Sequence, residues 1–332
     1  MLITPSIRAI RQLNPQANIS IFVGDWSKSA VENHPAIDEI ISYPDAYIQN
    51  KQPFKILELI NRLRKKHFHR VYIFHSHNLL HLMTKLAGIP ERYGFSFRGT
   101  GRLLTHSTEW QPNTARYIAD NYLDIPRLAG YSGNDLSLDL YLSEEEGKAA
   151  YELLSANGLN PGEYFIIAPG GGINPRQNVF EKRWSEDKFA ALIDLLGQNL
   201  TGEIILIGAP AEKSICEKIK SNCAAPVIDL CGKIPFRISA ALVKSAKALI
   251  CNDSAIMHTA VAFKTPSVTV FGPSNPLALL PVYPLNRWVS AGVDCSPCYC
   301  NEIFPGCQRD LMCMKELKPE KVLQVLLEAI DA

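Results

Sequence analysis

The second half of the chain alternates short apolar segments with amphipathic ones, and this alternation restricts the fold more than any other feature. Five apolar, β-branched segments end at turn residues, at 164–169, 203–210, 226–230, 248–253 and 267–273. Segments with helical periodicity separate them. Strands that alternate with helices in this way form right-handed βαβ units. Because these strands are apolar along their whole length, we expect a doubly wound parallel sheet that is covered on both faces.

The first half of the chain has the same pattern in a weaker form. The segments 18–24 and 70–75 are predicted strands, with predicted helices around the second. The chain begins with a helix, since Thr4 and Pro5 are an N-cap and a first helical turn. A βαβ unit needs a strand before that helix, so the sequence predicts an N-terminal α/β domain that lacks its first strand and the turn after it.

A helix that begins after Ser143 separates the two halves. Ser143 and Glu146 have the spacing of a capping box, and Gly158 marks the end of this helix. A chain of 332 residues is long enough for two hydrophobic cores. We therefore expect an N-terminal domain at 1–142 and a C-terminal domain at 143–317.

The last segment, 318–332, is predicted to be an amphipathic helix with Pro319 near its start. It needs an apolar groove on one of the two domains, and the N-terminal domain is one candidate.

Composition narrows the class of protein. The formal net charge of +1 argues against general nucleic-acid binding, which needs a basic excess. No uninterrupted apolar stretch approaches the roughly 18 residues of a membrane span, and the first residues do not resemble a signal peptide. The nine cysteines are therefore expected to be reduced thiols of a cytoplasmic protein.

Three glycines, Gly170, Gly171 and Gly172, follow the first strand of the C-terminal domain. Their spacing matches neither G-x-G-x-x-G nor G-x-x-x-x-G-K-[ST], which excludes the standard nicotinamide and P-loop sites. Lys182 comes shortly afterwards, just before a predicted helix at the carboxyl edge of the sheet, where a lysine can bind phosphate. The alternatives are a flexible strand exit and a surface lysine.

The segment CNDSAIMHTA is a second candidate. Asp253 ends a buried strand, Asp253 or Ser254 caps the next helix, and His258 lies one turn further on the same face. The N–H groups of a helix start beside a carboxylate suit a diphosphate and sugar hydroxyls. The alternative is a plain N-cap with His258 as a core histidine.

Two more strand exits, in FGPSNP (271–276) and IGAPAEK (207–213), are expected at the same edge, and the second places Glu212 near a helix start. Four polar strand exits along one edge describe a ligand crevice. The sequence shows no Ser–His–Asp nucleophile motif, no H-E-x-x-H and no paired metal carboxylates.

A cysteine-rich segment follows these exits. Cys295, Cys298, Cys307 and Cys313, with Cys300 among them, have spacings that suit a structural zinc or an iron–sulfur site. A loop of free or redox-paired thiols is the alternative.

Taken in order, these segments resemble the bacterial heptosyltransferases of lipopolysaccharide core synthesis, glycosyltransferase family 9. The resembling segments are TPSIRAIRQLNPQANISIFV, LAGIPERYGF as a mid-domain turn, APGGG with KRWSEDKFAALI, CNDSAIMHTAVAFKTPSVTVFGPSNP, and the cysteine-containing tail CSPCY…CQRDLMCMKELKPEKV. The resemblance implies the GT-B architecture, in which two doubly wound domains face each other across a cleft and the C-terminal helix crosses back. It also implies that 1–142 binds the acceptor and that 143–317 binds the nucleotide sugar.

The resemblance also implies roles for individual residues. Lys182 contacts the phosphates of the donor, and Glu212 contacts its nucleoside. The remaining donor-binding residues are Gly170, Gly171, Asp253, Ser254, Ala255 and His258. Ser254 and Ala255 stand where the family usually has Thr-Gly. In the family, the general base is an aspartate in the turn after the first strand. The resemblance therefore implies that the base lies before Met1 and that catalytic turnover depends on this aspartate.

The function that follows is an inverting, metal-independent glycosyl transfer, with Lys182 and Asp253 as catalytic residues. The expected donor is ADP-heptose, and the expected acceptor is a lipopolysaccharide-core or similar glycan. The alternatives are a non-catalytic nucleotide-sugar binder and another GT-B enzyme, such as a nucleotide-sugar epimerase. The basic segment RLRKKHFHR (62–70) either contacts anionic lipid at the inner face of the inner membrane or is a solvated helix end.

Overall fold

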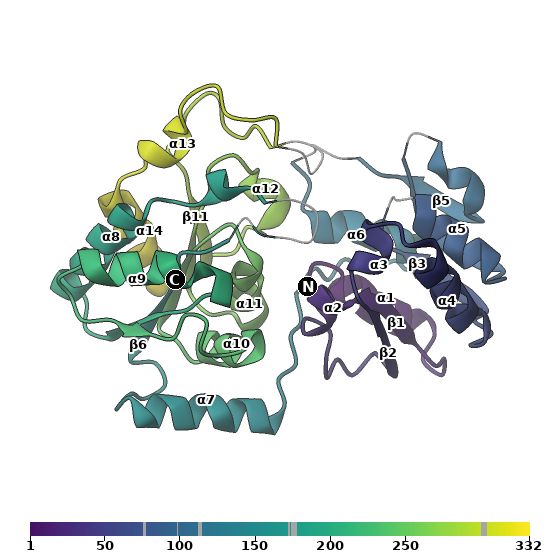
Figure 1. Ribbon diagram of the computed structural model, residues 1–332, viewed down its shortest axis with the longest axis horizontal. Helices are drawn as coiled ribbons and strands as arrows, with labels where there is room; N and C mark the ends of the chain where they lie inside the picture. Colours follow the sequence, from purple (N-terminus) through teal and green to yellow (C-terminus); the bar gives the residue numbers. More distant parts are fainter. Residues whose placement is uncertain (76–77, 98, 112–114, 172, 174–177, 300–303) are drawn as a thin grey trace. The chain divides into compact units, whose positions relative to one another are not determined.

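The computed structural model describes residues 1–75, 78–97, 99–111, 115–171, 173, 178–299 and 304–332. The chain divides into two compact units, Met1–Asp139 and Leu140–Ala332 (Figure 1). This division falls close to the expected boundary at residue 142. We call these parts unit 1 and unit 2 and describe each by itself.

Unit 2 contains a parallel sheet in the order β11-β10-β9-β6-β7-β8. Its strands are β6 (Tyr164–Ala168), β7 (Glu203–Leu206), β8 (Ile228–Asp229), β9 (Ala248–Asn252), β10 (Ser267–Val270) and β11 (Asn286–Val289). The five predicted strands are confirmed, whereas the sequence analysis missed β11, which begins with two polar residues and lies at the edge. From β6 the chain adds strands on one side as far as β8, and then continues on the other side with β9. The order therefore reverses between β6 and β9.

Helices cover both faces of this sheet, with α8 and α14 on one side and α10 and α11 on the other (Figure 1). Their bounds are α8 (Glu186–Asn199), α9 (Lys213–Asn222), α10 (Phe236–Lys244), α11 (Ala255–Phe263) and α14 (Pro319–Ile330). Side chains of β6 alternate between these layers. Phe165 and Ile167 join the core with α8 and α14, whereas the Tyr164 hydroxyl donates to the Leu242 carbonyl of α10 at 2.7 Å. This two-sided burial explains the continuous apolar character of the strands.

Helix α7 (Glu144–Ala156) confirms the predicted capping box. The Ser143 hydroxyl accepts from the Glu146 N–H at 3.2 Å, and the Glu146 carboxylate accepts from the Ser143 N–H at 2.8 Å. Arg237 of α10 also donates to Glu146 at 2.8 Å and anchors α7 to the rest of unit 2. Past the helix end, Gly158 has a φ of +71°, the left-handed conformation that favours glycine.

The C-terminal helix α14 belongs to the core of unit 2. Val322, Leu326 and Ala329 are buried together with residues of α8 and of the central strands. The apolar groove that the sequence analysis expected for this helix is therefore found in unit 2. Its apolar face is already matched by the groove between α8 and the sheet.

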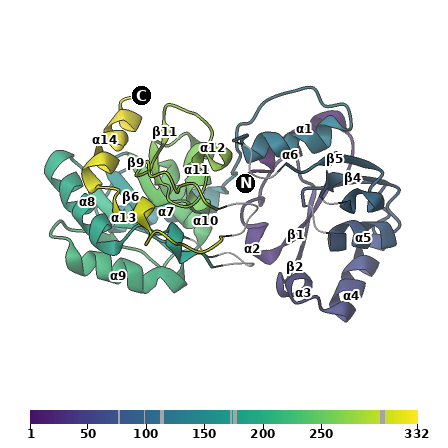
Figure 2. The ribbon, with the colours of Figure 1, turned by 90° about the horizontal axis from the view of Figure 1, so that it is seen from above.

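Unit 1 contains two separate parallel sheets, β1-β2 and β3-β4-β5 (Figure 2). The strands are β1 (Ser20–Gly24), β2 (Glu39–Tyr43), β3 (Arg70–Ile73), β4 (Glu91–Ser96) and β5 (His106–Glu109). The helices are α1 (Thr4–Leu13), α2 (Asp25–Lys28), α3 (Ala46–Gln49), α4 (Pro53–Arg64), α5 (Asn78–Leu86) and α6 (Ile118–Arg127).

Three strands of unit 1 were not expected. β2, β4 and β5 contain several charged or polar residues, which hid them from a search for apolar segments. β4 also corrects the expected mid-domain turn at 86–95, because residues 91–96 are extended and pair with β3 and β5.

Candidate functional site

The site lies in unit 2 where β6 and β9 end side by side. Ligands of open parallel sheets bind at the carboxyl ends of strands, at the point where the strand order reverses. β6 runs into Gly170 and Gly171, and β9 runs into Asp253 and Ser254. Asn252, which is fully buried, joins the two exits. Its side-chain amide donates to the Pro169 carbonyl at 2.7 Å.

Lys182 and Asp253 form an ion pair at this edge, with 2.8 Å between the lysine Nζ and the aspartate Oδ2. Their side chains are 14% and 9% exposed, so the pair is largely removed from water. The Ser274 hydroxyl donates to the same carboxylate oxygen at 2.5 Å, and Lys182 lies 4.4 Å from the centre of the Tyr299 ring. The sequence analysis placed Lys182 and Asp253 at the same edge, and the structure brings them into direct contact.

Glu212 holds the glycine loop in place. Its carboxylate accepts from the Gly171 N–H at 2.6 Å and from the Ala209 N–H at 2.8 Å. A Cβ at Gly170 would lie 2.0 Å from the Glu212 carboxyl carbon, so only glycine lets the carboxylate approach. Gly171 has a φ of +121°, which side chains rarely adopt. Gly170 and Gly171 therefore meet a steric requirement at this strand exit. Gly172 lies outside the described residues.

Arg183 is a site residue that the sequence analysis missed. Its Nε donates to the Gly171 carbonyl at 2.8 Å, and a terminal nitrogen lies 3.9 Å from the Glu212 carboxylate. That nitrogen is buried and makes no hydrogen bond within the described part of the chain. Burial lowers the pKa of Arg183, and Glu212 opposes the shift. The sequence signal that could have identified Arg183 is its position next to Lys182, because two adjacent cations then follow the same strand.

The start of α11 faces the same edge. Ser254 is its N-cap residue, but its side chain accepts no hydrogen bond from the first turn of the helix in the described structure. The N–H groups of this turn, beside the exposed Ala255, therefore form a partial positive charge.

His258 lies one turn further along α11 and is half-buried. Burial lowers its pKa to about 4, so the imidazole is neutral at pH 7. Its Nδ1 is buried and has no hydrogen-bond partner among the residues that the structure describes. A neutral imidazole can donate a hydrogen bond to a hydroxyl group or accept one from it, but it carries no charge.

The cysteine-rich segment does not support the zinc prediction. Cys295 and Cys298 are half-buried, Cys307 is exposed and Cys313 is buried, and all four are free thiols. Burial and the neighbouring thiols of Cys298, Cys295 and Cys307 raise the pKa of Cys313 to about 11. Within the described ranges, no three His, Cys, Asp or Glu side chains are arranged to hold a metal ion. Cys300 lies outside these ranges.

Comparison with known proteins gives consistent results. Residues 56–303 match the family described as glycosyltransferase family 9 (heptosyltransferase). Lipopolysaccharide heptosyltransferase 2 of Escherichia coli K12 is 26% identical over 297 residues, which cover 83% of this chain and 80% of the relative.

Two solved structures have a similar fold. A family 9 glycosyltransferase of Veillonella parvula has a TM-score of 0.83 and 22% identity, and the match covers 98% of this chain and 93% of that one. An E. coli heptosyltransferase solved with ADP-2-deoxy-2-fluoro heptose has a TM-score of 0.70 and 18% identity, over 98% and 95% of the two chains. These similarities confirm the predicted GT-B fold.

Proposed function

Because the chain belongs to glycosyltransferase family 9, the heptosyltransferase family, we propose that it transfers a heptose from ADP-heptose to a sugar of the lipopolysaccharide core. The relative that it resembles over most of its length is a lipopolysaccharide heptosyltransferase, and a structure with a similar fold was solved with an ADP-linked fluoro-heptose. The observation that carries the proposal is the Lys182–Asp253 pair beside the uncapped start of α11.

The proposed donor site uses each of these groups in a distinct way. The diphosphate lies at the first turn of α11, where the backbone N–H groups and Lys182 compensate its charge. Arg183 supplies a buried N–H group that makes no hydrogen bond to the described residues, and Glu212, next to Gly171, contacts the nucleoside. Asp253 accepts hydrogen bonds from sugar hydroxyls, and the neutral His258 accepts or donates them.

In the proposed reaction, an acceptor hydroxyl oxygen attacks the anomeric carbon from the face opposite the diphosphate, which inverts the configuration. The bond from the anomeric carbon to the phosphate oxygen breaks, and its electron pair stays on the departing ADP. Lys182 and the α11 dipole stabilise this growing negative charge. A carboxylate base takes the proton of the hydroxyl. Because two cations and a helix start already face the leaving group, we propose that the transfer needs no metal ion.

Membership of family 9 favours a transferase over the two alternatives, a non-catalytic binder and an epimerase. The test is calorimetric titration with ADP, GDP and UDP, followed by a transfer assay with ADP-heptose and a truncated lipopolysaccharide acceptor. We expect ADP to bind most tightly and heptose to appear on the acceptor. Binding of ADP-heptose without transfer would support the non-catalytic binder, and conversion of the free donor without acceptor would support the epimerase.

We also propose that the enzyme contacts the inner face of the inner membrane through α4. No described helix is long and apolar enough to cross a membrane. However, Phe54 and Leu57 on α4 are 84% and 53% exposed, and Arg62 and Lys65 follow on the same surface. Exposed apolar side chains next to cations suit an anionic lipid surface.

Co-sedimentation with vesicles of phosphatidylglycerol and phosphatidylethanolamine tests this contact. Phe54→Ala should reduce the bound fraction, whereas Tyr151→Ala, a change at an exposed aromatic residue of unit 2, should not. Equal binding of the wild type and Phe54→Ala would contradict the proposed surface.

A further inference from the structure

The carboxylate of Asp253 uses only one of its two oxygens within the protein. The Lys182 Nζ and the Ser274 hydroxyl both donate to Oδ2, at 2.8 and 2.5 Å. In the ranges that the structure describes, Oδ1 makes no hydrogen bond, although the side chain is only 9% exposed. A largely buried carboxylate is stabilised by hydrogen bonds to both oxygens. Asp253 therefore has one oxygen left for a hydrogen-bond donor of a ligand.

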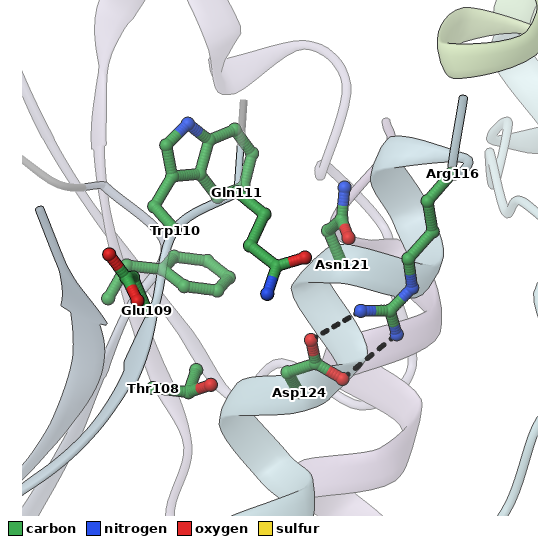
Figure 3. Close-up of a pocket in the computed structure, with 8 residues that line it drawn as sticks. Thr108, Glu109, Trp110, Gln111, Arg116, Asn121 and Asp124 are labelled. Atoms are coloured by element: carbon green, nitrogen blue, oxygen red, sulfur yellow. Dashed lines mark hydrogen bonds and ion pairs between the residues drawn. The ribbon is translucent and has the colours of Figure 1, made fainter. Parts of the chain in front are cut away.

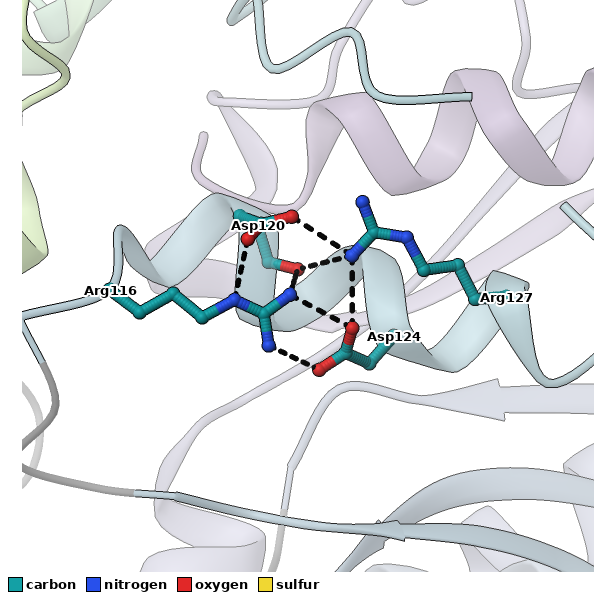
Figure 4. A network of polar contacts seen from close by, with 4 residues as sticks. All are labelled: Arg116, Asp120, Asp124 and Arg127. Atoms are coloured by element: carbon teal, nitrogen blue, oxygen red, sulfur yellow. Dashed lines mark hydrogen bonds and ion pairs between the residues drawn. The ribbon is translucent and has the colours of Figure 1, made fainter. Parts of the chain in front are cut away.

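A charged network of unit 1 differs from Asp253 in this respect. Part of it lines a pocket of about 90 Å³ (Figure 3), well below the roughly 300 Å³ of small-molecule sites. Two arginines and two aspartates form the network: Arg116, Asp120, Asp124 and Arg127 (Figure 4). Every carboxylate oxygen in it accepts at least one hydrogen bond from a guanidinium group. These carboxylates are saturated within the protein, whereas that of Asp253 is not.

Ser274 holds its hydroxyl at a fixed position beside Asp253. It is only 1% exposed, and it follows Pro273, whose ring restricts the backbone φ. The next residue, Asn275, caps helix α12 (Pro276–Leu279) with its side chain. The backbone is therefore restrained on both sides of Ser274.

The start of the cysteine-rich segment restrains the same loop. The N–H groups of Cys298 and Tyr299 both donate to the Pro273 carbonyl, at 2.9 and 2.8 Å. The Ser296 hydroxyl donates to the Gly272 carbonyl at 2.5 Å. This part of the segment therefore supports the loop through its backbone and one hydroxyl group.

Lys182 by itself does not fix the orientation of the carboxylate. A lysine ammonium is a point charge on a flexible stem with three rotatable donors. In the proposed donor complex it also bonds to the diphosphate, so its position adjusts when the donor binds. The bond from Ser274 does not depend on the phosphates, because this side chain is buried and donates only to Asp253 in the described structure.

We propose that Ser274 is a positioning residue for recognition of the donor sugar. By holding Oδ2 of Asp253, it directs Oδ1 toward a hydroxyl group of the sugar. This inference rests on the proposed function, in which Asp253 accepts hydrogen bonds from sugar hydroxyls. Ser274 is too buried to contact the donor itself. Its hydroxyl should therefore increase the affinity for the sugar part of the donor and leave the affinity for ADP unchanged.

Calorimetric titration of the full chain with ADP and with ADP-heptose, in the absence of acceptor, tests this role. The ratio of the two Kd values measures what the sugar contributes to binding. The variant is Ser274→Ala, and Ser155→Ala, at an exposed serine of α7, is the matched control. Urea denaturation of both variants establishes that they are folded under the conditions of the titration.

We expect Ser274→Ala to weaken binding of ADP-heptose by at least about fivefold, the effect of about one hydrogen bond. Its Kd for ADP should stay within about twofold of the wild-type value. The control should bind both ligands as the wild type does. A merely structural role of Ser274 would weaken the binding of ADP and of ADP-heptose alike.

The outcomes separate this inference from the proposed function. An unchanged affinity of Ser274→Ala for ADP-heptose, or an equal loss for both ligands, would overturn the positioning role and leave the proposed donor site intact. The positioning role is also overturned if the wild type binds ADP-heptose no more tightly than ADP. If the wild type binds neither ligand, the proposed donor site is wrong, and the positioning role is overturned with it.

Discussion

Replacement of Lys182 by alanine is the most direct test of the donor site. The variant leaves the Asp253 carboxylate buried with the Ser274 hydroxyl as its remaining side-chain donor in the described structure. Breaking a buried ion pair costs about 3–5 kcal/mol, and the Ser274 hydrogen bond and the residual exposure reduce this to about 2–4 kcal/mol. For a unit of this size, the expected decrease in Tm is roughly 4–16 °C.

The effect on binding is separate from the effect on stability. A hydrogen bond from a charged group contributes about 1.5–3 kcal/mol, so the Kd for ADP should rise about 10- to 150-fold in Lys182→Ala. Adenosine lacks the phosphates that Lys182 is proposed to contact. Its Kd should therefore be the same in the variant and in the wild type.

The assay is calorimetric titration with ADP and with adenosine, at a temperature where the variant is still folded. Lys213→Ala is the matched control, because Lys213 is exposed in unit 2 and pairs with Glu217 at 3.8 Å on the surface. An ADP affinity within about twofold of the wild type would refute a phosphate role for Lys182. An equal loss of ADP and adenosine binding would show that the variant distorts the whole site.

Three further predictions concern the same part of unit 2. The pKa of His258 is lowered by burial to about 4, against about 6.5 in the unfolded chain, so the free energy of unfolding should fall by up to about 3 kcal/mol between pH 6.5 and 4. Urea denaturation should show this loss in the wild type, and a loss of the same size in His258→Gln would contradict it. Gly171→Ala should lower stability by about 1–2 kcal/mol, because φ is +121° and the new Cβ would lie 3.2 Å from the Ser254 Cβ. Gly147→Ala, in an open position of α7, should instead raise the Tm. Glu212→Gln should cost about 1–3 kcal/mol, since an amide cannot accept from both backbone N–H groups, and an unchanged urea midpoint would argue against that geometry.

Much of unit 2 could be predicted because its signals are local. The strands β6, β7, β9 and β10 are runs of apolar residues, and the capping box of α7 is a spacing of three residues. β11 and the strands β2, β4 and β5 of unit 1 have no such signal, since they carry polar side chains and owe their extended form to pairing with neighbours.

The donor site, too, could be predicted from the sequence only in part. The sequence identified Lys182, Glu212 and Asp253 as polar residues at strand exits. It did not reveal Arg183, whose role depends on contacts with the Gly171 carbonyl and Glu212. It also missed a small pocket of unit 1 that Trp110 and Asn121 help to line, because these residues belong to no motif and their elements come together only in the folded unit.

The sequence by itself determined that this chain forms parallel α/β sheets and that its polar strand exits share one edge, because periodicity and turn residues act over a few positions. The tertiary structure decided which exits are neighbours. β9 pairs with β6 rather than with β8, which precedes it along the chain, and this pairing brings Lys182 to Asp253 across 71 positions. Burial of that pair, the approach of Glu212 to Gly170 and the neutral state of His258 are all consequences of packing, since each depends on groups that are distant in the sequence.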